Sequence, residues 1–405
     1  MSAHADVRHA PGPVGGAFFT PGVKIVAVVA GIGALAIVYR LAFGLGAATN
    51  LNDGYPWGLW IAFDVVTGTA LACGGYAMAL LVYILNKGQY HPLVRPALLT
   101  SAFGYTIAGV SVVLDVGRYW LLWKVPLYFW HWNLNSVLLE VALCIMAYTM
   151  VLWIELSPAF FERGVTAETP WIRRVSERGL PFMKKALVWV IALGLLLPTM
   201  HQSSLGSLLL LAGPRLHELW NTPLLPLLFL VSCVGMGYAA VVMEGALASS
   251  VLKRRPEREM LAGLGQAILP VLGLYLVLRL GDLVWRGQLG ALFAFDLYSV
   301  LSLIEIGLFI AAPLMLATER QRADMGNLFR AAMVLVLGGA LYRFDVYLVA
   351  FNPGAHWSYF PSVGETLVTA GLVSLEVLGY VMIVKYFPIL TGRAPEARAP
   401  ILART

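Results

Sequence analysis

Long runs of apolar residues recur along the whole chain and are separated by short polar segments. Each run holds about twenty residues or more, which is enough for a helix to cross a hydrocarbon layer about 30 Å thick. The runs predict ten transmembrane helices at approximately 24–46, 57–86, 97–122, 130–156, 184–205, 222–252, 259–284, 293–318, 328–350 and 361–387. The pattern therefore indicates an all-α, multi-pass integral membrane protein, with no stretch left for a sizeable soluble domain.

The composition agrees with a chain surrounded by lipid. Hydrophobic residues make up 59% of the 405 residues and charged residues 12%, whereas soluble domains carry roughly twice that charged fraction. The net charge of +6 does not indicate a nucleic-acid partner, because the basic residues lie in short loops where membrane topology explains them. The first apolar run follows about twenty polar, Gly/Pro/Ala-rich residues, so we expect a retained helix rather than a cleaved signal.

The basic residues also predict the orientation of the chain. Assigning alternate loops to opposite sides places 21 of the 28 Lys and Arg on one side, 4 on the other and 3 inside the runs. The sparse side holds Arg118, Lys124, Arg215 and Arg286. Because Lys and Arg accumulate in cytoplasmic loops, we expect both termini to be cytoplasmic, with 1–23 and 388–405 as cytoplasmic tails.

A weak internal repeat suggests how the helices are grouped. Cys73-Gly-Gly-Tyr76 resembles Cys233-Val-Gly-Met-Gly-Tyr238, Asp115-Val-Gly-Arg118 resembles Arg279-Leu-Gly-Asp282, and Ser136-Val resembles Ser299-Val. A repeat of four helices predicts two parallel four-helix bundles, spans two to five and spans six to nine. The expected divisions are 24–46 for a peripheral first helix, 47–205 and 206–350 for the bundles, and 351–387 for the tenth helix with its preceding loop. Chance similarity between apolar segments remains the alternative.

The three cysteines offer no metal site. Cys73, Cys144 and Cys233 are far apart in the sequence, and each lies inside an apolar run. They therefore provide no ligand set for zinc or for an iron-sulfur cluster. We expect them to be small buried apolar side chains.

Polar residues gather toward one end of the second to fifth spans. A charged group inside the membrane costs at least about 2.5 to 3.5 kcal/mol, so each one needs a partner, water or a function. By the predicted topology this end is periplasmic, and the residues that converge there are Asp64, Asp115, Arg118, His131, Glu140, His201 and Gln202. We expect Asp115 and Arg118 to share one helix face, and His131 to lie at the start of the fourth span.

Such a cluster suits a quinone. A quinone ring needs hydrogen-bond partners and a supply of protons within apolar and aromatic walls, and histidine titrates near neutrality. Two structural alternatives remain open: the surrounding Trp and Tyr residues form an interfacial belt, and Asp115 and Arg118 form an internal ion pair. A proton or solute transporter whose buried charges line a path is the functional alternative, and an inert anchor is a third.

Other buried ionisable residues support no firm assignment. We expect those of the second bundle to compensate one another within a network between helices; they are Arg279, Asp282, Asp296, Glu305, Arg343 and Asp345. A proton route is a further use for four scattered acidic residues that the sequence does not order: Glu140, Glu155, Glu244 and Glu376. No predicted span has a histidine near its middle, so we expect no haem.

Several motifs resemble a known family. They are Asn50-Leu-Asn-Asp-Gly-Tyr-Pro-Trp-Gly-Leu-Trp-Ile-Ala-Phe-Asp64, Gly88-Gln-Tyr-His-Pro-Leu-Val-Arg-Pro96, Asp115-Val-Gly-Arg-Tyr-Trp120, Leu197-Pro-Thr-Met-His-Gln-Ser-Ser-Leu-Gly206 and Ala350-Phe-Asn-Pro-Gly354. They look like the NrfD-like, polysulfide-reductase-type membrane subunits, and are most similar to the HybB group of nickel-iron hydrogenase membrane subunits. The resemblance covers most of residues 40–390.

The resemblance implies a subunit of the bacterial inner membrane that is not catalytic alone and holds no haem, iron-sulfur cluster or metal. It implies a menaquinone site near the periplasmic face, supplied with electrons by a ferredoxin-like iron-sulfur subunit, with the large and small hydrogenase subunits beyond it. Carried over by motif, Asp64, Asp115, Arg118 and His201 are the first site candidates, with His131 and Glu140 as neighbours. The membrane anchor of another oxidoreductase of this type remains an alternative.

Overall fold

A computed structural model describes residues 11–252 and 257–391, and within them it contains ten helices long and apolar enough to cross a membrane. The predicted count is therefore confirmed. In order they are Pro21–Phe43, Trp60–Ile84, Gly88–Asp115, Val137–Gly164, Pro170–Leu210, Leu225–Val251, Arg258–Trp285, Leu297–Met315, Met325–Val349 and Val363–Tyr386. Seven of the 21 basic residues assigned to the cytoplasm lie outside the described residues: Arg8, Lys253, Arg254, Arg255, Arg393, Arg398 and Arg404.

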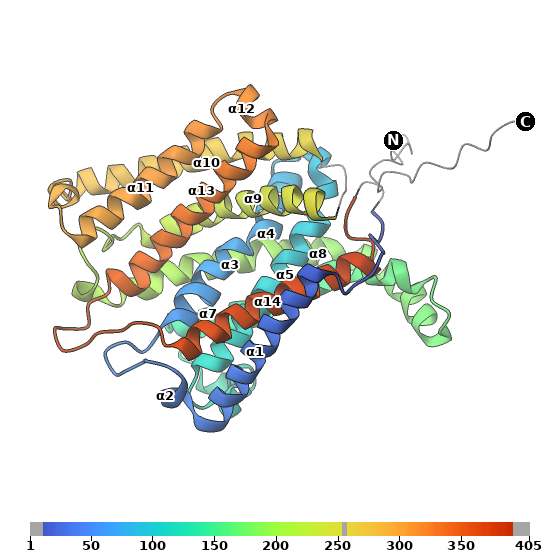
Figure 1. The fold of residues 1–405 in the computed structure, drawn as a ribbon, viewed down its shortest axis with the longest axis horizontal. Helices are drawn as coiled ribbons and strands as arrows, with labels where there is room; N and C mark the ends of the chain where they lie inside the picture. The colour runs from blue at the N-terminus through green and yellow to red at the C-terminus, as the bar shows by residue number, and fades with distance from the viewer. Residues whose placement is uncertain (1–10, 253–256, 392–405) are drawn as a thin grey trace, which may run out of the picture.

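Seven of the ten spans are single α-helices, and their labels follow Figure 1. They are α1 (Pro21–Phe43), α7 (Val137–Gly164), α8 (Pro170–Leu210), α9 (Leu225–Val251), α10 (Arg258–Trp285), α11 (Leu297–Met315) and α14 (Val363–Tyr386). The third span consists of η4 (Gly88–Leu93) and α5 (Val94–Asp115), and the ninth consists of α13 (Met325–Phe344) and η9 (Asp345–Val349). The short helix α12 (Glu319–Ala323) joins α11 to α13.

The second span is irregular along its length. It runs through a π-helical turn η2 (Trp60–Thr67), α3 (Gly68–Leu71), α4 (Gly74–Ala79) and a second π-helical turn η3 (Leu80–Ile84). Widened turns of this kind occur frequently at functional sites. Asp64 lies within the first of them, and the side-chain hydroxyl of Thr67 donates to the carbonyl of Ala62 at 2.9 Å.

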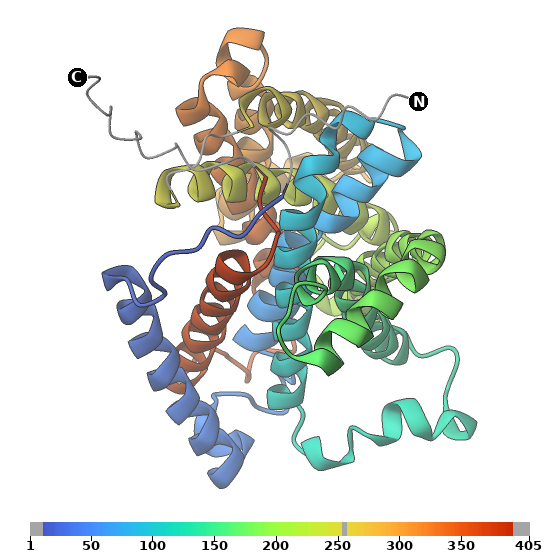
Figure 2. The same ribbon diagram turned by 90° about the vertical axis from the view of Figure 1, so that its right-hand side faces the viewer.

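Two predicted helix boundaries are wrong at the predicted periplasmic end. The third span ends at Asp115, because Val116 adopts an extended conformation with ψ 124°. The fourth span begins only at Val137, where the Ser136 side chain accepts from the amide of Leu139 and so caps the helix. Residues 116–136 form short turns instead, including α6 (Lys124–Leu127), and Figure 2 shows this teal segment extending away from the main body.

Within each predicted group of four, helices that follow one another in the sequence pack against each other. Span two contacts α5, α5 contacts α7, and α7 contacts α8; in the second group α9 contacts α10, α10 contacts α11, and α11 contacts α13, which returns to α9. The two groups also contact each other, since α8 and α4 both pack against α9, so the division into two bundles stays a prediction. α1 packs along α14, and Figure 1 shows this pair lying together at the side of the body.

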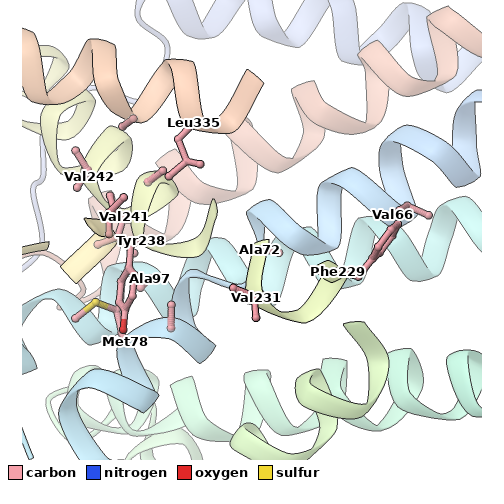
Figure 3. Close-up of a cluster of buried hydrophobic side chains, with 14 of the residues drawn as sticks. Val66, Ala72, Met78, Ala97, Phe229, Val231, Tyr238, Val241, Val242 and Leu335 are labelled. Atoms are coloured by element: carbon pink, nitrogen blue, oxygen red, sulfur yellow. The ribbon is translucent and has the colours of Figure 1, made fainter. Parts of the chain in front are cut away.

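The core lies where span two meets α9. Figure 3 shows this apolar cluster, in which α9 contributes half of the labelled side chains and span two, α5 and α13 the others: Val66, Ala72, Met78, Ala97, Phe229, Val231, Tyr238, Val241, Val242 and Leu335. At Gly237 of α9 the two helices approach so closely that a β-carbon would collide with the carbonyl of Cys73. Cys73 and Cys233 pack in one buried cluster here, although they are 160 positions apart in the sequence.

Candidate functional site

Asp64 lines a cavity with a volume of about 450 Å³. The cavity is bounded by span two, α5, α9 and α14, and its walls are mostly apolar side chains such as Phe63, Ile107 and Met243. Three carboxylates line it, one each from span two, α9 and α14: Asp64, Glu244 and Glu376. A space of this size with apolar walls and a few polar groups is typical of a small-molecule site.

The carboxylates at the two ends of this cavity are held by hydroxyl groups of α14. The Thr369 hydroxyl donates to Asp64 Oδ2 at 2.9 Å, and the Tyr380 hydroxyl donates to Glu244 Oε1 at 2.5 Å. Asp64 Oδ1 is buried and has no partner among the described residues. An unsatisfied buried carboxylate oxygen is costly, so this oxygen is available to a bound molecule or to a proton.

The polar residues of α14 occupy one face of the helix. Glu365, Thr369, Glu376 and Tyr380 are separated by four, seven and four residues, which places them along a single stripe. The stripe runs from the first turn of α14, where Glu365 lies, past Asp64 and along the cavity to Glu244. The tertiary structure thus brings Glu244 and Glu376, which the sequence alone left unordered, to one cavity, whereas Glu155 of α7 does not line it.

The line continues beyond Glu244. This residue also lines a second, smaller cavity of about 50 Å³, whose walls include Glu257 at the start of α10 and Thr391. The Thr391 hydroxyl donates to Glu257 Oε1 at 3.2 Å. Carboxylates therefore follow one another from the N-terminal end of α14 to the C-terminal end of α9.

Asp115 lies near Glu365, at one end of this line, but Arg118 is not beside it. Because the helix ends at Asp115, Arg118 points into solvent, and the expected shared helix face is wrong. The guanidinium near Asp115 belongs to Arg40 of α1, which is buried and donates to the carbonyls of Leu114 at 2.6 Å and Val116 at 2.9 Å. Sequence reasoning missed Arg40 because α1 had no assigned role in the site.

The Asn50 to Asp64 motif surrounds the beginning of α14. Glu365 accepts from the amide of Asn50 at 3.1 Å, and the hydroxyl of Tyr359 donates to it at 2.5 Å. Burial raises the pKa of Tyr359, which lies in the loop before α14, so its proton is retained. The Trp60 indole donates to the carbonyl of Glu365 at 3.1 Å. The motif therefore fixes the position of the acidic end of α14.

His201 and Gln202 belong to a different group on the other side of span two. Gln202 donates to Thr69 Oγ1 at 3.0 Å, and Arg343 donates to Gln202 Oε1 at 3.5 Å. Asp64 lines the cavity described above, whereas Thr69, His201 and Gln202 do not. The structure therefore separates His201 and Gln202 from the cavity that Asp64 lines.

The imidazole of His201 is fully buried and has no hydrogen-bond partner on either ring nitrogen among the described residues. Its nearest aromatic contact is Tyr105, at 5.5 Å between ring centroids. A buried polar group without a partner requires an explanation. His201 is consequently the described residue with the clearest unused ligand capacity.

The remaining candidates lie outside both groups. His131 is exposed in the 116–136 segment beside Tyr128 and Trp130, so the prediction that it begins the fourth span is wrong. Glu140 is partly exposed in the first turn of α7. The structure therefore brings Asp64 and Asp115 into one line of acidic residues, places His201 and Gln202 behind span two, and leaves Arg118 and His131 at the surface.

The ionisable residues of the second group of helices are only partly paired. Arg279 lies 3.5 Å from Glu305, which also accepts from the Trp220 indole at 2.8 Å, and Asp282 pairs with Arg286 at 2.7 Å. The contact between Arg279 and Glu305 agrees with the expected network, whereas Asp282 pairs with Arg286, which is outside that set and only four residues away. The three others depart from it: Asp296 is exposed and caps α11, both carboxylate oxygens of Asp345 lack a partner among the described residues, and Arg343 donates only to neutral groups.

Comparisons with known proteins identify relatives along almost the whole chain. Residues 47–351 match the family model described as polysulphide reductase, NrfD. The chain is 44% identical over 390 residues to the probable Ni/Fe-hydrogenase 2 b-type cytochrome subunit of Escherichia coli (strain K12), covering 95% of this chain and 96% of that protein. It is 31% identical over 252 residues to the menaquinone reductase integral membrane subunit of Nitratidesulfovibrio vulgaris, covering 60% of this chain and 58% of that protein.

One relative corrects our expectation about haem. The Escherichia coli protein is named a b-type cytochrome subunit, so the expectation that a chain of this kind carries no haem is contradicted. Haem iron is held most often by histidine, and His201 has the required buried, unpartnered nitrogens. The other described histidines, which are His91, His131, His217 and His356, are exposed or only partly buried, and no ring contact joins any of them to His201. The described residues thus offer one suitable imidazole.

The match to the family model spans far more than half of the chain, and the relative from Escherichia coli is aligned nearly from end to end. Residues 47–351 contain eight of the ten described spans, including the irregular second one. The chain accordingly belongs to the NrfD polysulphide reductase family of multi-pass membrane proteins.

Proposed function

We propose that this chain is the membrane subunit of a respiratory oxidoreductase complex and that it passes electrons to menaquinone. The names of two relatives, a hydrogenase subunit and a menaquinone reductase subunit, support this class of function. In this proposal, which follows the motif resemblance rather than the relatives' names, a periplasmic ferredoxin-like iron-sulfur subunit delivers the electrons and the large and small subunits of a nickel-iron hydrogenase supply it. The chain contributes the quinone site and the protons that the reduction needs.

The cavity beside Asp64 is the observation that carries the proposal. Its volume of about 450 Å³, its apolar walls and its three carboxylates suit a ring with two polar oxygens and an apolar tail. In this proposal the free oxygen of Asp64 contacts the quinone ring, while Glu376 and Glu244 lie within the same space. Reduction to the quinol adds two electrons from the partner subunit and two protons from groups that line the site.

The line of carboxylates supplies those protons and allows translocation to be coupled to the reaction. Asp115 and Glu365 lie at one end, Asp64, Glu376 and Glu244 border the cavity, and Glu257 lies at the other end. Carboxyl groups with water between them can relay protons by alternate protonation. His201 and Gln202 remain candidates for a second polar site, outside the cavity and next to Thr69 of span two. Three further candidates would face the partner subunit: Arg118, His131 and Glu140.

The experiment compares variants of the cavity in the intact membrane complex. Asp64→Asn and Glu376→Gln should lower donor-dependent reduction of a menaquinone analogue by about 100-fold or more, the usual loss when a proton-transfer group is removed. Dye reduction by the catalytic partner should stay unchanged in both variants. Asp53→Asn, which changes an exposed carboxylate eleven residues from Asp64, is the matched control and should behave as wild type. Wild-type quinone reduction in both cavity variants would disprove this assignment.

A second candidate function rests on His201. Both of its ring nitrogens are buried without a partner, and the relative from Escherichia coli is named a b-type cytochrome subunit. If haem b is bound, we expect His201 to hold the iron, and a dithionite-reduced minus oxidised spectrum of the purified chain should show a b-type α band that His201→Ala abolishes. An absent band, or a band unchanged in the variant, removes His201 from this role and leaves the quinone proposal untouched.

A further inference from the structure

The fifth span, α8, is far longer than a membrane requires. Its 41 residues extend about 60 Å at 1.5 Å per residue, roughly twice the thickness of the hydrocarbon layer. Only 11% of its most apolar stretch is buried, the smallest share of the ten described spans. Figure 1 shows the green hairpin of α7 and α8 projecting beyond the ends of the neighbouring helices.

An apolar seam runs along the uncovered side of α8. Val175, Phe182, Trp189 and Leu196 follow one another at intervals of seven residues, and their exposed fractions are 52%, 68%, 76% and 54%. Trp171, Leu193 and Met200 lie beside them at intervals of four and are exposed as well. A strict seven-residue interval is the pattern by which one helix presents a continuous contact line to another helix.

Lipid cannot cover the whole seam. Residues 170–187 of α8 hold five basic residues, Arg173, Arg174, Arg178, Lys184 and Lys185, so this part lies outside the hydrocarbon layer. Val175 and Phe182 nevertheless remain exposed within it. An apolar seam that continues from the membrane into water calls for a partner protein that also extends from the membrane into water.

The charge of the same segment describes that partner. Glu177 is the one acidic residue among residues 170–187, against five basic ones, and all six of these side chains are exposed. Arg178 and Lys185 lie next to the seam, three residues after Val175 and Phe182. Acidic residues at this end of a partner helix would pair with these basic side chains and stabilise the complex, because complementary charges flank the seams of paired helices.

We propose that the seam of α8, formed by Val175, Phe182, Trp189 and Leu196, is the docking surface for a transmembrane helix of a partner subunit. That helix crosses the membrane beside α8 and continues past the hydrocarbon layer on the side of the basic residues. It carries apolar residues at heptad spacing throughout, and acidic residues at the end that lies beside the basic residues of α8. The proposal is independent of the quinone cavity, which lies between other helices.

Photo-crosslinking in membranes that contain the assembled complex tests this surface directly. A benzophenone amino acid replaces Phe182 or Trp189 on the seam, or Arg173 as the control. Arg173 is nine residues from Phe182 and therefore faces the opposite side of the helix. We expect both seam positions to crosslink to one transmembrane helix of a co-purifying subunit, and this helix should carry acidic residues beside the basic segment of α8. We expect no crosslink from Arg173. Crosslinks to a second copy of this chain, to lipid alone or to nothing would overturn the proposal.

Charge reversal provides the second measurement, because it leaves the membrane-embedded residues unchanged. Arg178→Glu should reduce the amount of partner that co-purifies with this chain by about tenfold, whereas Arg173→Glu should not. An acidic-to-basic change in the partner helix should then restore assembly with Arg178→Glu. Equal recovery of the partner with both single variants would contradict the proposed surface.

Discussion

Individual buried charges in this protein are stabilised in different ways. Arg279 lies beside Glu305, whose two oxygens also accept from Trp220 and Tyr275. Arg343 instead donates to the Ser232 hydroxyl at 3.2 Å, to the carbonyl of Phe229 at 3.2 Å and to other neutral acceptors. Hydrogen bonds to neutral groups compensate a buried cation less fully than a carboxylate does. The pair Arg279 and Glu305 is therefore the better place to test how charge is held in the core.

Glu305→Ala should destabilise the protein by about 3 to 5 kcal/mol, because it leaves Arg279 buried without its counter-charge. Thermal unfolding in detergent, followed by loss of the monodisperse species, measures this effect. The double replacement Arg279→Met with Glu305→Met should recover most of the lost stability, since it removes both charges. Glu319→Gln at an exposed position serves as the control, and an equal effect there would contradict the explanation.

At the scale of elements, small residues decide how the peripheral helices attach. α1 is mostly exposed, with 17% of its most apolar stretch buried, and packs along α14. Gly33 faces the backbone of Gly371, where a β-carbon on either residue would collide with the other helix. Close contact between small residues is a common basis of helix association in membranes, where apolar burial alone provides little attraction.

Gly33→Val should therefore separate α1 from α14 and cost about 1 to 3 kcal/mol, the usual range for overpacking. Gly31→Val is the matched control, because nothing lies within 4 Å of a β-carbon built there. Crosslinking between cysteines introduced near Gly33 and Gly371 reports the separation, and thermal unfolding reports the energy. Equal behaviour of the two variants would show that this contact does not hold α1 in place.

For the whole molecule, orientation in the membrane decides which end of the carboxylate line faces the partner subunit. The distribution of basic residues, 21 on one side against 4 on the other, predicts that Asp115 and Glu365 lie at the periplasmic end. The partner would then dock beside the 116–136 segment and the loop before α14. In the opposite orientation protons would have to enter from the other end of the line.

Reporter fusions measure this orientation. Green fluorescent protein fused to the C-terminus should fluoresce, because it folds in the cytoplasm, and alkaline phosphatase inserted at Gly354 should be active, because that loop is predicted to be periplasmic. A fusion between α7 and α8, near residue 167, should repeat the C-terminal result. Active phosphatase at residue 167 with an inactive insertion at Gly354 would reverse the predicted orientation.

The sequence by itself determined the features that depend on local composition. Ten spans, the family and the presence of acidic residues near one end could be predicted, because the length of an apolar run and the quoted motifs are properties of neighbouring residues. The helix ends at Asp115 and Val137 could not be predicted, because aromatic residues in the loop between them extend the apolar runs on both sides.

Only the tertiary structure decided which polar groups share a space. Asp64 meets Thr369 across 305 positions of sequence, and Tyr380 meets Glu244 across 136. Arg40 rather than Arg118 lies beside Asp115, and His201 does not line the cavity, because helix packing and the end of α5 decide which side chains meet. Such contacts join residues from different spans, and the apolar pattern of one span carries no information about the face that another span presents to it.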